Sequence, residues 1–162
     1  MRHHAVVTLR ISRADFADPA LAAFHQAHLD DLAPTAPPES RHALDLGGLQ
    51  APGVRMWVGH LDDGTPRLVA TAALAALAPD HEELKSMRTE PAVRGRGLAS
   101  TMLEHVLADA RARGVARVSL ETGSMAFFAP AHALYRRHGF TDCGPFGAYA
   151  ADPNSTFMTL AL

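Results

Sequence analysis

The sequence has little of what ties a protein to an oxidising compartment, a membrane or nucleic acid. Cys143 is the only cysteine among 162 residues, so no internal disulfide can form, which is typical of a reducing compartment. Lys and Arg number 15 against 17 Asp and Glu, so the chain generates no global field for nucleic acid or an anionic membrane. It shows neither a run of about 20 apolar residues nor a secretory signal. We therefore expect a cytoplasmic protein whose partner is a small molecule or a single protein.

Apolar residues make up 48% of the chain and charged residues 20%. This composition supplies one compact core and too little material for two ordinary domains. We therefore expect residues 1–162 to form a single domain.

The apolar pattern predicts both strands and helices. Asp18 and Pro19 are typical of a helix start, and the periodicity that follows predicts a helix over residues 19–33. A second helix is well marked over 97–113 by the apolar stripe Leu98, Met102, Leu103, Val106, Leu107 and Ala110. Shorter helices are expected near 38–49 and 130–138, and strands over 5–12, 54–61, 67–77, 83–89, 115–121 and 155–162. These elements predict an α+β fold, with a mixed, mostly antiparallel sheet flanked by helices.

The segment Arg94-Gly95-Arg96-Gly97-Leu98-Ala99 joins a predicted strand directly to the start of the second helix. Free backbone N–H groups and the positive end of the helix dipole attract anions to such a turn, and glycine lets a phosphate approach the main chain. Arg94 and Arg96 add positive charge. The turn is therefore a candidate pyrophosphate site that needs no metal.

Three phosphate-binding motifs compete for this turn, with an ordinary surface turn as the structural alternative. The P-loop GxxxxGK[ST] is excluded because the chain has no Gly-Lys pair. The dinucleotide motif GxGxxG fits Gly95 and Gly97 but meets Ser100 at its third glycine, although Glu121 lies near the expected acidic position. The preceding strand is also too polar for the buried central strand of that fold. The pattern [QR]xxGx[GA] matches residues 94–99 at every specified position.

The run LKSMRTEPAVRGRGLA, a predicted helix, then VARVSLE and ALYRRHGF together resemble the GNAT superfamily of acetyl-CoA-dependent acetyltransferases. The resemblance covers residues 81–140 well, the last strand loosely and the first 80 residues only in the order of elements. Segments 37–44, 120–125 and 152–158 are similar to the bacterial YsnE-type branch. The family often has an asparagine where Phe128 stands in this chain.

The resemblance implies acetyl-CoA as co-substrate and no metal. It places the pyrophosphate at the turn, formed by Arg94, Gly95, Arg96, Gly97, Leu98 and Ala99. It places the pantetheine arm and the thioester beside the strand before the turn, at Met87, Arg88 and Thr89. By its position in the LYxxxGF segment, Tyr135 corresponds to the usual proton donor to the departing thiolate; the alternative is a tyrosine that only packs on the core.

Transfer to an amine also needs a proton acceptor, because an alkyl ammonium with a pKa of about 10.4 is not a nucleophile. Glu121 ends its predicted strand beside the expected thioester position. Glu82 and Glu83 start the neighbouring strand, and Glu83 is the second candidate base. For each of these glutamates, the alternative to a role as base is that the side chain is only solvated or ion-paired.

The leading hypothesis is an N-acetyltransferase that acts by direct transfer to an amine of a small molecule or amino-acid-like acceptor. The alternatives are a non-catalytic acyl-CoA-binding or regulatory domain and a nucleotide-dependent oxidoreductase; Tyr135 favours the acetyltransferase. A homodimer is left open. His25 and His28 have a spacing compatible with a metal but lack a third ligand, so a core or pocket-lining role is expected. The residues expected to line the acceptor pocket are Pro37, Arg41, His42, Trp57, Phe127, Phe146 and Tyr149.

Overall fold

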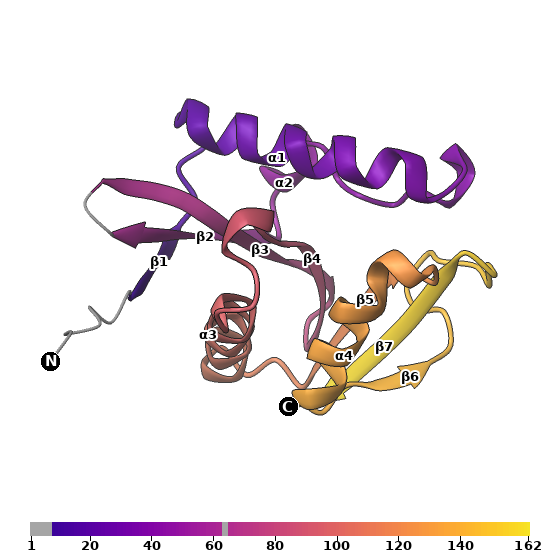
Figure 1. Ribbon diagram of the computed structural model, residues 1–162. Helices are drawn as coiled ribbons and strands as arrows, with labels where there is room; N and C mark the ends of the chain where they lie inside the picture. Colours follow the sequence, from indigo (N-terminus) through magenta and orange to yellow (C-terminus); the bar gives the residue numbers. More distant parts are fainter. Residues whose placement is uncertain (1–7, 63–64) are drawn as a thin grey trace, which may run out of the picture.

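The computed structural model describes residues 8–62 and 65–162. Within these ranges seven strands form one sheet in the order β1-β2-β3-β4-β5-β7-β6. The strands are β1 (Leu9–Arg13), β2 (Val54–Asp62), β3 (Pro66–Ala78), β4 (His81–Thr89), β5 (Arg117–Gly123), β6 (Thr141–Cys143) and β7 (Ser155–Ala161). The helices are α1 (Pro19–Leu32), α2 (Leu46–Leu49), α3 (Leu98–Ala112) and α4 (Ala129–Arg137). Figure 1 shows α1 and α2 on one side of the sheet and α3 on the other, as the predicted mixed fold requires.

Alternate residues of the central strands face two separate apolar layers. Met56 and Val58 of β2 pack with Leu21 of α1 on one side. Trp57 of β2 belongs to the larger layer on the other side, which includes Leu134 of α4 and the whole apolar stripe predicted for α3. Trp57 is only 3% exposed and packs in this core layer, so the expectation that it lines the acceptor pocket is wrong. A strand alternates its side chains between two faces, and Trp57 faces the core under α3.

Capping residues explain where the first helices begin. The Asp18 carboxylate accepts a 2.9 Å hydrogen bond from the Ala20 N–H, and Pro19 follows at the first helical position, as predicted. The helix predicted over 38–49 is wrong, since only a 3₁₀ turn at Pro38–Ser40 and the short α2 form there. Asp45 caps α2 by accepting a 2.7 Å bond from the Gly48 N–H, and two glycines limit its length. Residues 41–45 consequently form a loop.

Several sequence predictions need correction or lie outside the described ranges. β6 was not predicted, because its three residues are too few for a periodic pattern. Residues 5–7 of the first predicted strand and residues 63–64 of the hairpin turn lie outside the described residues. β4 lies in the middle of the sheet, although its polar sequence argued against a buried central strand. Its charged residues can be buried because Glu82, Glu83 and Arg88 each have an oppositely charged partner. No helix in the described ranges is both long and apolar enough to span a membrane.

β4 and β5 run parallel and are connected through α3, and they separate part of the way along. They pair only from His81 opposite Arg117 to Leu84 opposite Leu120. Beyond that point β4 follows β3 as far as Thr89, whereas β5 follows β7 to its last residue. The second halves of β4 and β5 therefore face each other without pairing.

A β-bulge on β4 marks the point where the two strands part. The register against β3 shifts between Thr71 and Ala73, and β4 has one extra residue there. Ser86 has a φ of 52°, and it is the one described residue other than glycine with a positive φ. Thr71 Oγ1 holds the bulge with a 2.8 Å hydrogen bond to the Ser86 carbonyl oxygen. Because a bulge bends its strand, it accounts for the departure of residues 87–89 from β5.

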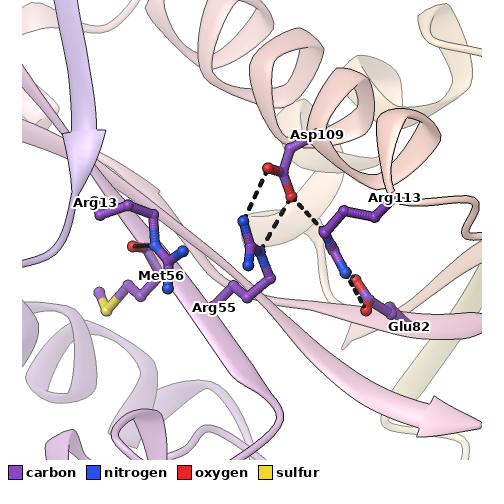
Figure 2. A network of polar contacts seen from close by, with 6 residues as sticks. All are labelled: Arg13, Arg55, Met56, Glu82, Asp109 and Arg113. Atoms are coloured by element: carbon purple, nitrogen blue, oxygen red, sulfur yellow. Dashed lines mark hydrogen bonds and ion pairs between the residues drawn. The ribbon is translucent and has the colours of Figure 1, made fainter. Parts of the chain in front are cut away.

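Ion pairs fix the C-terminal half of α3 against the sheet, as Figure 2 shows. Asp109 of α3 accepts hydrogen bonds from Arg55 of β2 at 3.0 Å and from Arg113 at 2.7 Å. Arg113 also donates two bonds to the Glu82 carboxylate of β4, at 2.8 and 2.7 Å. The network ties α3 to two strands and thereby sets the position of its N-terminus, where the predicted anion site lies.

Candidate active site

Two neighbouring cavities lie where β4 and β5 separate. The first, here called the turn cavity, has a volume of about 350 Å³ and is bounded by β4, the turn before α3 and α4. The second, here called the loop cavity, has a volume of about 460 Å³ and is bounded by α1, residues 33–43, the middle of β4 and the end of β5. Both are lined by His28, Leu32, Met87, Phe128, Ala131 and Tyr135. These six residues, here called the shared wall, are where two molecules bound in the two cavities would meet.

The turn cavity contains the backbone cradle predicted from the sequence. Gly95 and Gly97 have φ values of 82° and 76°, a left-handed conformation that glycine adopts without a steric penalty. Within the described ranges the N–H groups of Leu98, Ala99 and Ser100 donate no hydrogen bond. These are the free donors of the first turn of a helix, at the positive end of its dipole. The cradle is therefore suited to an anion such as a phosphate.

Most residues predicted to bind the cofactor line the turn cavity. These are Met87, Arg88, Thr89, Arg94, Gly95, Gly97, Leu98 and Ala99. Arg96 is exposed and does not line the cavity. Arg94 Nε donates a 3.1 Å hydrogen bond to the Thr89 carbonyl oxygen, which ties the turn to the end of β4. Sequence reasoning missed Arg137 of α4, a further cation in the lining, because it lies 40 residues away in the chain.

The side chain of Arg88 is directed to α1. It is 7% exposed, donates a 2.8 Å bond to the Asp31 carboxylate and lies 5.4 Å from the centre of the Phe24 ring. Burial and the Arg88 charge lower the pKa of His28 to about 4, so its imidazole is neutral at physiological pH. The C-terminal half of the α1 helix is thus joined to β4 by an ion pair and contributes the neutral His28 ring to the shared wall.

The two histidines of α1 do not form part of a metal site in the described ranges, where no group of three potential ligands comes together. His25 is buried, and its Nε2 makes a 2.7 Å hydrogen bond with the Leu44 carbonyl oxygen. His28 lines both cavities. The structure therefore places one histidine in the core and the other in a pocket wall, as the sequence analysis expected.

Tyr135 combines a buried ring with an unengaged hydroxyl. Its ring is 5% exposed and packs 5.6 Å from the Phe140 ring. Its hydroxyl makes no hydrogen bond to any residue of the described ranges, and the residue lines both cavities. Burial raises the pKa of the hydroxyl, so it stays protonated at neutral pH. Tyr135 can therefore donate a proton at the shared wall.

The two candidate bases both line the loop cavity but differ in their surroundings. Glu83 Oε2 accepts hydrogen bonds from the Tyr149 hydroxyl at 2.5 Å and from Lys85 Nζ at 3.1 Å. Glu121 has no ion-pair partner in the described part of the chain. Burial raises the pKa of Glu121 and outweighs the nearby charges of His42 and Lys85, which lower it. Glu121 is consequently the carboxylate left available to a ligand.

The predicted lining of the acceptor pocket is only partly right. Arg41 and His42 line the loop cavity, and Phe127 lines the turn cavity. Pro37, Phe146 and Tyr149 line neither cavity. The two aromatic rings pack on each other, 5.1 Å apart, and the Tyr149 hydroxyl is hydrogen-bonded to Glu83.

Phe128 stands in both cavity walls, at the position where the family often has asparagine. Its ring packs so tightly against Gly123 that a Cβ there would approach it to 2.2 Å. Gly123 at the end of β5 therefore makes room for Phe128.

Comparisons with known proteins agree with this architecture. Residues 21–140 match the profile of the acetyltransferase (GNAT) family. The chain is 43% identical over 152 residues to the uncharacterized N-acetyltransferase YedL of Escherichia coli (strain K12), covering 94% of each protein. It is 44% identical over 135 residues to the uncharacterized N-acetyltransferase YsnE of Bacillus subtilis (strain 168), covering 83% of this chain and 87% of YsnE.

A similar fold is found in a provisionally assigned acyl-CoA N-acyltransferase from Klebsiella pneumoniae. Its crystal structure superposes with a TM-score of 0.76 at 26% identity, over 96% of this chain and 98% of the other. Sequence profile, relatives and fold agree: the chain belongs to the GNAT family of acetyltransferases and is an acyltransferase.

Proposed function

We propose that this protein transfers an acetyl group from acetyl-CoA to the amine of a small molecule or amino-acid-like acceptor. The observation that carries the proposal is the wall shared by the turn cavity and the loop cavity, where Tyr135 offers a free hydroxyl. Enzymes of the family use acetyl-CoA, whose thioester supplies an activated acetyl group. Adjoining cavities support direct transfer between two bound molecules.

The turn cavity offers suitable contacts for CoA. The N–H groups at the start of α3 would hold the pyrophosphate, with Arg94 and Arg137 as nearby cations. The backbone of Met87 and Thr89, which β5 leaves unpaired, would hold the amide groups of the pantetheine arm.

Two side chains at the shared wall and in the loop cavity would handle the protons. Glu121 would take the proton that the acceptor ammonium must lose before its nitrogen attacks. Tyr135 would give a proton to the sulfur as the carbon–sulfur bond breaks and the carbon–nitrogen bond forms. Glu83 is the less suitable base, because Tyr149 and Lys85 already occupy its Oε2.

Acetyl-CoA should stabilise the fold without any added metal. A ligand at 100 times its Kd contributes about 2.7 kcal/mol, which raises the melting temperature of a chain of this size by about 5 to 10 °C. Thermal unfolding with acetyl-CoA in the presence of EDTA measures this, with NADH as the control. A shift with NADH and none with acetyl-CoA would assign the turn to a dinucleotide instead.

Gly97→Ala should weaken CoA binding about tenfold, equivalent to ~1.4 kcal/mol, because a methyl group would intrude where the pyrophosphate approaches the main chain. Gly114→Ala is a matched control. Both glycines have a left-handed φ, 76° and 82°, and neither has an atom within 4 Å of the added Cβ. Both variants should therefore lose a similar ~1–2 kcal/mol of stability, but Gly114 lies outside the cavity.

Isothermal titration with CoA and thermal unfolding on the two variants separate binding from strain. Equal CoA affinity in Gly97→Ala and Gly114→Ala would place the phosphate elsewhere.

A further inference from the structure

The charged side chains around the loop cavity are not all paired. Glu83 and Lys85 form an ion pair of 3.1 Å with little exposure of either side chain, so together they present no net charge. In the described part of the chain, Glu121 has no ion-pair partner. The terminal guanidinium nitrogens of Arg41 and the ring nitrogens of His42 likewise make no hydrogen bond or ion pair there. The lining of the cavity therefore presents two carboxylates without an ion-pair partner in the described part of the chain, Glu121 and the exposed Asp30, and two potential anion-binding groups, Arg41 and His42.

Hydrogen bonds join the loop that carries Arg41 and His42 to residues 152–154. The buried Ser40 donates a 2.6 Å hydrogen bond to the Asp152 carboxylate, and Asn154 Nδ2 donates to Ser40 Oγ at 3.4 Å. The Asp152 carboxylate also accepts the Asn154 backbone N–H at 2.8 Å, and these hydrogen bonds and the His42 charge lower its pKa, so it stays ionised. Asp152 does not line the loop cavity and makes no ion pair with Arg41 among the described residues.

Both side chains on this loop are also oriented by local contacts. Arg41 Nε donates a 2.8 Å bond to the Ala36 carbonyl oxygen, which fixes the stem of the side chain and leaves its terminal nitrogens available. The His42 ring lies 4.9 Å from the Tyr149 ring in an edge-to-face arrangement. Such fixed donors bind an anion at a smaller entropic cost than flexible side chains would.

We infer that the acceptor carries a carboxylate close to its amine, and that Arg41 and His42 bind this carboxylate while Glu121 receives the amine. The inference rests on the proposed acetyl transfer and specifies its acceptor. A planar guanidinium matches the two oxygens of a carboxylate, and an ammonium is attracted to the unpaired glutamate. A free amino acid has both groups on adjacent atoms, and the loop cavity of about 460 Å³ accommodates a molecule of that class with its side chain.

This inference can be tested with series of acceptors whose members differ only in the carboxylate. Each common amino acid is compared with its amide and with the amine left by decarboxylation, and kcat/KM is measured from CoA thiol release. Charge-assisted hydrogen bonds to the carboxylate should favour the amino acid about 10- to 100-fold. A difference in the basicity of the two amines cannot produce this preference. The α-amine of an amino-acid amide loses its proton more readily than that of the amino acid, which would favour the amide.

Arg41→Gln should lower kcat/KM about 10- to 100-fold for the amino acid and much less for its amide, so that the preference for the carboxylate is lost. Arg111→Gln is the matched control, because Arg111 is exposed on α3 and lines neither cavity. Arg41→Lys should retain part of the preference, and an unchanged melting shift with acetyl-CoA verifies that the variants fold.

Equal rates for the acid, amide and amine, or an Arg41→Gln variant that slows all three alike, would overturn carboxylate recognition and leave acetyl transfer standing. An absence of CoA release with every acceptor, in a protein that binds acetyl-CoA, would instead overturn the proposed function together with this inference.

Discussion

Tyr135→Phe should lower kcat by about 100-fold while CoA affinity and melting temperature stay at their wild-type values. General acids contribute ~10²- to 10⁴-fold, and the low end applies because a thiolate is already a fair leaving group. Phenylalanine keeps the ring that packs on Phe140, and the lost hydroxyl has no hydrogen-bond partner among the described residues. Stability should therefore not change.

Measuring kcat, CoA Kd and thermal unfolding on one Tyr135→Phe preparation separates the proposed acid from a residue that only packs. Unchanged turnover with a competent acceptor would remove Tyr135 from the mechanism. A wild-type protein that bound CoA but turned over no acceptor at all would instead favour the alternative of a non-catalytic CoA-binding domain.

Glu121→Gln should lower kcat/KM by about 100-fold, the usual contribution of a general base. Burial raises the pKa of Glu121 above its ordinary value of 4.5, so wild-type activity should fall as the pH drops through that raised pKa. The variant should lack this acidic limb in its pH profile. Its stability at neutral pH should be equal or higher, because a raised pKa means that the folded state disfavours the charged carboxylate.

Glu83→Gln is the matched control, since it makes the same change on the neighbouring strand of the same cavity. Its main effect should be a lower melting temperature, from a loss of about 1–3 kcal/mol in the buried contacts with Lys85 and Tyr149. If the acidic limb of the pH profile were lost in Glu83→Gln and kept in Glu121→Gln, Glu83 would be the general base and Glu121 would not.

The parts of the fold that depend on local periodicity could be predicted from the sequence. Every residue in the apolar stripe predicted for α3 is buried, because one face of a helix is defined by spacing alone. The turn of residues 94–99 could be predicted for the same reason, since glycines and a following helix specify its geometry. The family resemblance then pointed to Tyr135, which proves to line both cavities.

The choice between strand faces could not be made from the sequence. Glu82 and Glu83 are adjacent and must face opposite sides of β4. Only the packed structure shows that Glu82 pairs with Arg113 of the α3 layer and that Glu83 faces the loop cavity. Trp57 was misplaced by the same ambiguity. The ties between residues 40 and 152–154 are likewise invisible locally, because they join segments more than 100 residues apart.

The separation of β4 and β5 gives this sheet two inner edges in addition to the outer edges of β1 and β6. An unpaired strand edge can form backbone hydrogen bonds with a strand of another polypeptide, and this is one way in which β-sheet proteins aggregate. Here α1 and α4 stand beside the inner edges and line the same cavities. Covering a strand edge with helices is one way in which proteins prevent another chain from pairing with it. The fold can thus keep backbone groups ready for a ligand in the middle of its sheet without exposing them to other chains.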